Sequence, residues 1–196
     1  MKLSVHIEEW EMVQPFRIAG SEWTHSRGIV VQLASDDHLG RGEAQGVFYL
    51  GETAESMLEQ VTESAIEICQ GISREELQDL LPPGGARNAV DCALWDLECK
   101  QSGKSVWELT GIEPGPVTTV FTIGMEATPG AMADKAAAAS DAPILKIKLD
   151  SHHPVEKLTA IREARPMPGW WWMPIRAGIS ICSERSFPDA GISVSR

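Results

Sequence analysis

The feature that most constrains the fold is a change of pattern near residue 116. From there the chain alternates strand-like and helix-like segments, over residues 117–123, 128–140, 144–149 and 154–164. Such alternation predicts a parallel sheet built from right-handed strand–helix–strand units. Because a parallel sheet needs cover on both faces and neighbours on both edges, two strands are too few, and more strands are expected to follow.

The segment before this change has a different pattern. Three short strand-like stretches, residues 3–12, 28–33 and 39–43, predict an antiparallel meander. Helical spacing then recurs in four segments: 54–69, 73–81, 85–101 and 105–110. Ser-x-x-Glu capping boxes at Ser73 and Ser105 mark the starts of two of these helices. The Pro- and Gly-containing residues 113–116 predict a linker, and we expect a domain boundary there.

Small residues form one stripe of the helix expected at 85–101. They are Ala86, Ala89, Val90 and Ala93. Short side chains allow two elements to pack at close distance, so this helix is expected to lie close against its neighbour.

Charge and composition exclude several classes of partner. The net charge of −11 argues against binding to nucleic acid or to an anionic membrane, because both need a basic face. The N-terminus lacks the apolar core of a signal peptide, and no stretch approaches the length of a membrane span. We therefore expect a cytoplasmic protein. The four cysteines form no CxxC pair, which predicts buried free thiols rather than a zinc site or disulfides.

The stretch LKIKLD, residues 145–150, carries the most chemistry. Side chains alternate along a strand, so Lys146 and Lys148 point to one face and the apolar residues between them to the other. In a barrel both lysines would point inward, where desolvation and their mutual repulsion lower a lysine pKa enough to make a base near neutral pH. An edge strand with two solvated lysines fits the pattern equally well.

Three stretches decide between these alternatives. They are GARNAVDCALWDL (85–97), YLGET (49–53), and ILKIKLD (144–150) with the helical residues 156–166 after it. Together they resemble the N-terminal part of enolase-superfamily enzymes of the muconate-lactonizing group, and most of all dipeptide epimerases of the L-Ala-D/L-Glu type. The resemblance extends over roughly residues 1–166.

The resemblance implies an α+β capping domain over residues 1–115, with a three-stranded antiparallel meander and helices. The truncated start of a (β/α) barrel follows over 116–166, with the active site at the carboxyl ends of the strands. The implied activity is Mg²⁺-assisted 1,1-proton transfer at the α-carbon of a dipeptide substrate. Lys148 would be an acid/base, and Lys146 would lower its pKa.

In this family a second lysine on a later strand and three acidic Mg²⁺ ligands complete the site. We expect no metal ligands within this chain. The resemblance is compatible with a homo-oligomeric state of the intact enzyme. Alternatives are another enzyme of the group, a cycloisomerase or dehydratase, and a truncated product without enzymatic function.

Glu22 and Trp23 lie in the loop expected at 16–23, where the family's cap closes over the substrate. Epimerases selective for glutamate have an arginine near this position. A carboxylate beside an indole disfavours an anionic substrate side chain and favours an apolar or cationic one. The resemblance therefore implies a substrate-specificity role for these two residues.

The stretch MPGWWWMP, residues 167–174, holds three of the seven tryptophans. Tryptophan and methionine each have a single codon, so this stretch fixes much of its own DNA. Shifted by one base, the codons read Val-Val-Asp-Ala, a strand ending in the acidic residue that the barrel needs next. Loss of one base after Pro166 therefore predicts that residues 167–196 are an out-of-frame tail. An aromatic stacking platform or an interfacial aromatic cluster is the alternative.

Two other groups of polar residues are not expected to form sites. His152 and His153 are adjacent, so their side chains diverge, and no carboxylate pair accompanies them at ligand spacing. Asp91, Asp96 and Glu98 lie on the helix expected at 85–101, where a surface or interface role is favoured over catalysis.

Overall fold

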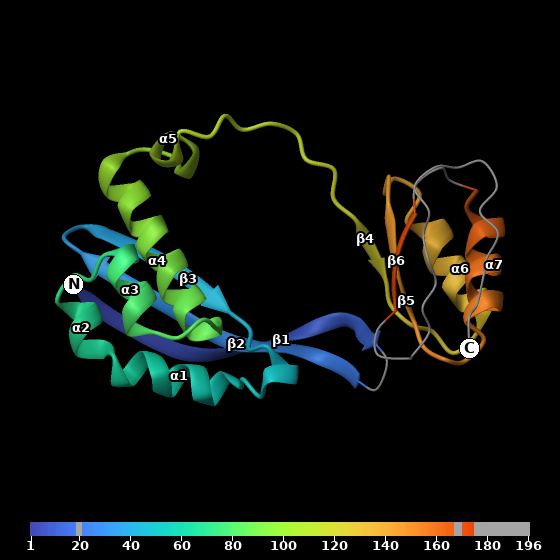
Figure 1. Cartoon of the computed structure of the whole chain (residues 1–196), viewed down its shortest axis with the longest axis horizontal. Coiled ribbons are helices and arrows are strands. Elements are labelled where there is room, and N and C mark those ends of the chain that lie inside the picture. The colour runs from blue at the N-terminus through green and yellow to red at the C-terminus, as the bar shows by residue number, and fades with distance from the viewer. Residues whose placement is uncertain (19–20, 167–169, 175–196) are drawn as a thin grey trace. The chain divides into compact units, whose positions relative to one another are not determined.

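The computed structural model describes residues 1–18, 21–166 and 170–174 (Figure 1). Packing divides the chain into two compact units. Unit 1 contains residues 1–11 and 25–115, and unit 2 contains the described residues of 12–24 and of 116–174. The domain boundaries expected at 115 and 166 stay a prediction. Within the described ranges, no helix is both long enough and apolar enough to cross a membrane.

An antiparallel sheet of order β1-β2-β3 forms the base of unit 1, which confirms the predicted meander. The strands are β1 (Lys2–Ile18), β2 (Ser21–Ser35) and β3 (His38–Ala44). The β2–β3 register runs from Ile29 opposite Ala44 to Ser35 opposite His38. The turn after Ser35 uses Asp36, whose φ of 52° suits a short polar side chain.

The first two strands are much longer than predicted. The stretch 16–23, expected to be a loop, belongs to β1 and β2, which run to within two residues of each other at the hairpin tip. All residues between 9 and 17 are exposed or half-buried. Because neither face of this part of the hairpin packs into a core, its sequence lacks the apolar alternation by which strands are recognised.

Helices cover one face of the sheet. They are α1 (Ala54–Glu63), α2 (Ala65–Cys69), α3 (Arg74–Leu80), α4 (Gly85–Ser102) and α5 (Val106–Thr110), with the 3₁₀ turn η1 (Phe48–Leu50) before them. The capping boxes predicted at Ser73 and Ser105 are confirmed. The single helix expected over 54–69 is interrupted at Ser64, which serves as C-cap of α1 and N-cap of α2.

Close packing of α4 on β3 is confirmed, and it depends on glycines as well as on the alanine stripe. A Cβ atom on Gly40 would lie 2.2 Å from the carbonyl oxygen of Ala93, and one on Gly42 would lie 2.0 Å from that of Ala89. Real Cβ atoms do not approach so closely. The helix therefore lies directly on the strand backbone, and its small residues join the buried core of unit 1.

Glu52 ties the loop before α1 to the start of α4. Its two carboxylate oxygens accept hydrogen bonds from the backbone N–H groups of Val47, at 2.8 Å, and Gly85, at 2.9 Å. The second bond brings a negative charge to the N-terminus of a long helix, where the helix dipole favours it. The sequence reasoning missed this contact between two of the stretches that carry the family resemblance.

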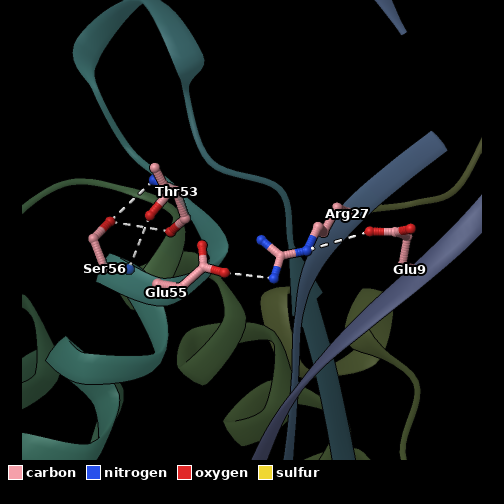
Figure 2. Close-up of polar contacts among 5 residues, drawn as sticks. All are labelled: Glu9, Arg27, Thr53, Glu55 and Ser56. Atoms are coloured by element: carbon pink, nitrogen blue, oxygen red, sulfur yellow. Dashed lines mark hydrogen bonds and ion pairs between the residues drawn. The ribbon is translucent and has the colours of Figure 1, made fainter. Parts of the chain in front are cut away.

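Arg27 on β2 joins the sheet to the start of α1 (Figure 2). Its Nη2 donates to the Glu55 carboxylate at 2.5 Å, and its Nε lies 3.3 Å from the Glu9 carboxylate on β1. The pKa of Glu55 is lowered to about 2, and the hydrogen bond from Arg27 is the largest cause. Figure 2 also shows the capping box at the same helix start, formed by Thr53 and Ser56.

Unit 2 contains a parallel sheet of order β4-β5-β6. The strands are β4 (Phe121–Ile123), β5 (Leu145–Leu149) and β6 (Trp170–Pro174), and the helices are α6 (Pro129–Ala138) and α7 (Pro154–Ala164). The two helices pack together, and their apolar residues form one buried cluster with the sheet. Strand–helix alternation in this region is therefore confirmed.

The strands of unit 2 differ from the sequence-based expectation in two places. The strand expected at 117–123 is reduced to three residues, since β5 offers β4 partners only from Leu145 onward. Residues 170–174, in the predicted out-of-frame tail, form a strand that pairs in parallel with β5. Tryptophan fits strands well, and this stretch meets an open edge of β5. The rest of the predicted out-of-frame tail, residues 167–169 and 175–196, lies outside the described residues.

Three cysteines within the described ranges are free thiols. Cys69 and Cys99 are half-buried and Cys92 is exposed, so none of these three thiols is buried as predicted. Cys182 lies outside the described residues.

Candidate functional site

Strand β5 presents its side chains to two different environments. Leu145, Ile147 and Leu149 are buried in the cluster formed with α6 and α7. Lys146 and Lys148 alternate with them and therefore point to the opposite face of the sheet. Lys146 is half-buried, and Lys148 is buried with 9% of its surface exposed. A solvated edge strand, the alternative left open by the sequence, does not fit a lysine this buried.

The pKa of Lys148 lies below the usual value for lysine. Burial is the main cause, because it penalises the ammonium form, and the positive charge of Lys146 adds to the effect. The neutral amine of Lys148 is therefore available at a lower pH than that of an exposed lysine. A neutral amine with an adjacent cation is chemically suited to accept a proton.

The carboxylate that follows β5 is already engaged. Asp150 accepts hydrogen bonds from the Lys157 ammonium at 3.1 Å and from the His152 backbone N–H at 3.0 Å. Burial would raise the pKa of Asp150, but these bonds outweigh it and lower that pKa overall. Lys157 is 2% exposed and Asp150 is half-buried, so this ion pair is partly buried. The sequence reasoning missed Lys157, whose only signal is its place in the first turn of the helix that follows the strand.

The described residues do not fit a magnesium site. No group of three or more His, Cys, Asp or Glu side chains within the described ranges could hold a metal ion. His153 starts α7 in a left-handed conformation, with φ 51°, and its Nδ1 lies 3.4 Å from the Glu156 carboxylate. This pair sits at a helix start, as expected for a loop histidine.

Glu22 and Trp23 lie at the start of β2, in the part of the hairpin that belongs to unit 2. The Glu22 carboxylate accepts a hydrogen bond of 2.5 Å from Nε of Arg17 on β1. This bond is the main reason that the pKa of Arg17 is raised. The ring of Trp23 lies 6.2 Å from that of Phe16, centroid to centroid. Glu22 is therefore a paired carboxylate, and the sequence reasoning missed its partner.

Asp96 and Glu98 on α4 have structural partners. Asp96 accepts from the Arg41 backbone N–H at 2.8 Å and from Lys100 at 2.6 Å. Glu98 pairs with Arg74 at 2.8 Å. The surface or interface role expected for these two residues agrees with such contacts.

Comparison with known proteins gives the family. The description "Mandelate racemase / muconate lactonizing enzyme, N-terminal domain" matches residues 1–111. The L-Ala-D/L-Glu epimerase of Escherichia coli K12 is 38% identical over 167 residues, which cover 84% of this chain and 52% of that protein. A hydrophobic dipeptide epimerase of Roseobacter litoralis is 29% identical over 162 residues, covering 80% of this chain and 47% of that protein. The chain thus spans about half the length of the curated relatives it matches.

Solved structures agree. An enolase family member from Agrobacterium tumefaciens with homology to dipeptide epimerases, solved with sodium and L-Ala-L-Glu, matches with a TM-score of 0.81 and 32% identity. The match covers 87% of this chain and 52% of that one. A dipeptide epimerase from Enterococcus faecalis, solved with Mg and L-Leu-L-Tyr, has a TM-score of 0.73 at 24% identity, covering 84% and 50%, and shows the fold alone.

These matches confirm the predicted fold class, an α+β capping domain followed by the start of a (β/α) barrel, and the predicted likeness to dipeptide epimerases. Relatives of the chain are epimerases and racemases, and solved neighbours were obtained with magnesium or sodium. The chain belongs to the mandelate racemase / muconate lactonizing enzyme family of the enolase superfamily.

Proposed function

We propose that this chain supplies the capping part and the first barrel strands of an isomerase that moves a proton at the α-carbon of a dipeptide. Lys148 is the acid/base in this proposal. The observation that carries it is the burial of Lys148 beside Lys146, on the face of β5 that α6 and α7 do not cover. The pKa of Lys148, lowered by burial and by Lys146, supports the same role.

In the proposed step the neutral Lys148 amine accepts the α-proton of the substrate. The C–H bond breaks, its electron pair moves into the adjacent carboxylate to form an enediolate, and the amine becomes an ammonium. The positive charge of Lys146 lowers the pKa of Lys148 and so limits the protonation of Lys148 before the step. A group on the opposite face returns a proton to the α-carbon and inverts it. The described residues do not fit Mg²⁺, so no step is assigned to the metal that the resemblance implies.

The proposed substrate is a dipeptide whose second residue is apolar or basic. Glu22 and Trp23 support this choice, because an indole packs against apolar groups and attracts cations, and a carboxylate repels an anionic side chain. The Roseobacter litoralis relative is described as a hydrophobic dipeptide epimerase. The Agrobacterium tumefaciens structure instead holds L-Ala-L-Glu, so the family spans both classes.

The codon pattern of residues 167–174 favours a second possibility for the polypeptide as it stands. If one base is lost after Pro166, the product is a non-enzymatic truncated form, and restoring the frame gives the isomerase. Resequencing the gene tests this directly. An open reading frame that reproduces the present tail in independent reads, with no Val-Val-Asp-Ala frame beyond it, contradicts the frameshift.

Exchange of the α-proton with solvent deuterium tests Lys148 in the frame-restored protein. We expect Lys148→Ala to abolish exchange with at least one epimer of the dipeptide, because one face loses its base. Lys104→Ala, in the exposed turn after α4, is the matched control and should retain exchange. Undiminished exchange with both epimers in Lys148→Ala refutes the assignment of Lys148 as the acid/base. The proposed selectivity is tested separately, by a screen of dipeptides, and a screen that ranks Ala-Glu first refutes it.

A further inference from the structure

The hairpin tip, residues 12–18 and 21–24, contacts the loop that follows β4. The Met125 backbone N–H donates to the Arg17 carbonyl oxygen at 3.1 Å. The ring of Phe16 packs near Gly124, since a Cβ atom built on that glycine would lie 3.7 Å from the Phe16 ring. Both contacts lie within unit 2, so they belong to one compact body.

Phe16 also contacts the residue proposed to select the substrate. Its ring lies 6.2 Å from that of Trp23, with an angle of 33° between the planes. Phe16 therefore has one neighbour in the proposed specificity pair and one in the loop after the first barrel strand. An aromatic ring in this position can hold the indole in a fixed place relative to that loop.

Arg17 connects the same two regions through charge. Its guanidinium donates to Glu22 at 2.5 Å. Its positive charge is also stabilised by Glu126, in the loop after β4. Glu126 is held in turn by Lys135 on α6, at 2.5 Å, with 18% of the Glu126 side chain exposed. The charges alternate in sign from Glu22 to Lys135, so each neighbour attracts the next.

We propose that Phe16 and Arg17 are positioning residues that fix Glu22 and Trp23 against the loop after β4. Phe16 does so by packing, and Arg17 by its hydrogen bond to Glu22 and its electrostatic attraction to Glu126. The effect of Phe16 and Arg17 on substrate selectivity rests on the proposed function, whereas their role in holding Glu22 and Trp23 against the loop does not. Because Arg17 offsets the charge of Glu22, the indole of Trp23 is the main recognition group for the apolar or basic second residue of the proposed substrate.

Hydrogen exchange at the Met125 amide tests the anchor in the full chain, without any substrate. This N–H is hydrogen-bonded to Arg17 only while the hairpin tip contacts the loop after β4. Its exchange rate therefore reports how often that contact opens. We expect Phe16→Ala to speed exchange by on the order of tenfold, through loss of aromatic packing. Arg17→Gln should speed it by about two- to fivefold, the effect of an exposed ion pair. Arg17→Lys, which keeps the charge, should restore most of the protection.

Two matched variants serve as controls. Phe48→Ala removes a ring that packs edge-on against Tyr49, and Arg27→Gln removes a guanidinium with two carboxylate partners, both in unit 1. Neither should change exchange at Met125. The proposal is overturned if Met125 exchanges at the unfolded rate in the wild type, if the tip variants have no effect, or if the controls act equally. Because no proton transfer is measured, failure of the proposed reaction leaves this result unchanged.

Discussion

At the scale of single residues, Lys148 combines a structural cost with the proposed chemistry. Its folded-state pKa lies below 10.5, the ordinary value, so the unfolded chain binds more protons in the interval between the two. Stability of unit 2 therefore rises with pH through that interval and gains nothing further above it. The burial that depresses the pKa is the same feature that suits Lys148 for accepting a proton, so stability and function oppose each other here.

Replacing Lys148 by an apolar residue should therefore raise the stability of unit 2. We expect Lys148→Met to stabilise unit 2 near neutral pH by about 1 kcal/mol, since a buried ammonium is removed. The advantage should shrink as the pH approaches 10.5, where wild-type Lys148 becomes neutral in both states. Urea unfolding followed by the methyl NMR signal of Ile147 measures this. A pH-independent difference, or the same gain in exposed Lys104→Met, contradicts the explanation.

At the scale of elements, the small residues of α4 and the glycines of β3 allow the helix to pack closely against the strand. Gly42→Ala should destabilise unit 1 by about 3 kcal/mol, because its Cβ would meet the Ala89 carbonyl at 2.0 Å and backbone atoms must move. Gly115→Ala, with nothing within 4 Å of the added atom, is the control. Denaturant unfolding of both variants gives the difference, and equal stabilities would show that α4 can shift at little cost.

The sequence predicted elements whose patterns arise from burial or capping. The apolar stripe of α4, the Ser73 and Ser105 caps and the alternation in β5 are examples. It missed the outer part of the β1–β2 hairpin, where exposed residues carry no periodic signal. It also missed the partners of Glu22 and Asp150, because pairing across a hairpin or between a strand and a helix depends on tertiary geometry. The sequence predicted that Lys146 and Lys148 share one face of the strand. The burial of Lys148 could not be predicted, because it depends on the sheet and helices around it.

At the scale of the whole molecule, the two units differ in how completely their sheets are covered. In unit 1, three strands lie under helices and share a continuous core. In unit 2 the described sheet has three parallel strands, and Phe121 on β4 keeps 52% of its surface exposed. A parallel sheet is normally buried on both faces, and a complete barrel takes about 250 residues. Unit 2 is therefore expected to open locally far more often than unit 1.

Amide exchange and activity of the purified 196-residue chain test this expectation together. Amides of β5 should exchange at least about tenfold faster than those of α4 in the same molecule, which serves as its own control. We also expect partial aggregation through unit 2, no specific Mg²⁺ binding and no epimerase activity. An α-proton next to a carboxylate is too weak an acid for one lysine to remove at a useful rate without further stabilisation of the enediolate. Magnesium-dependent epimerisation by this polypeptide alone would show that the described strands and the tail already supply that stabilisation.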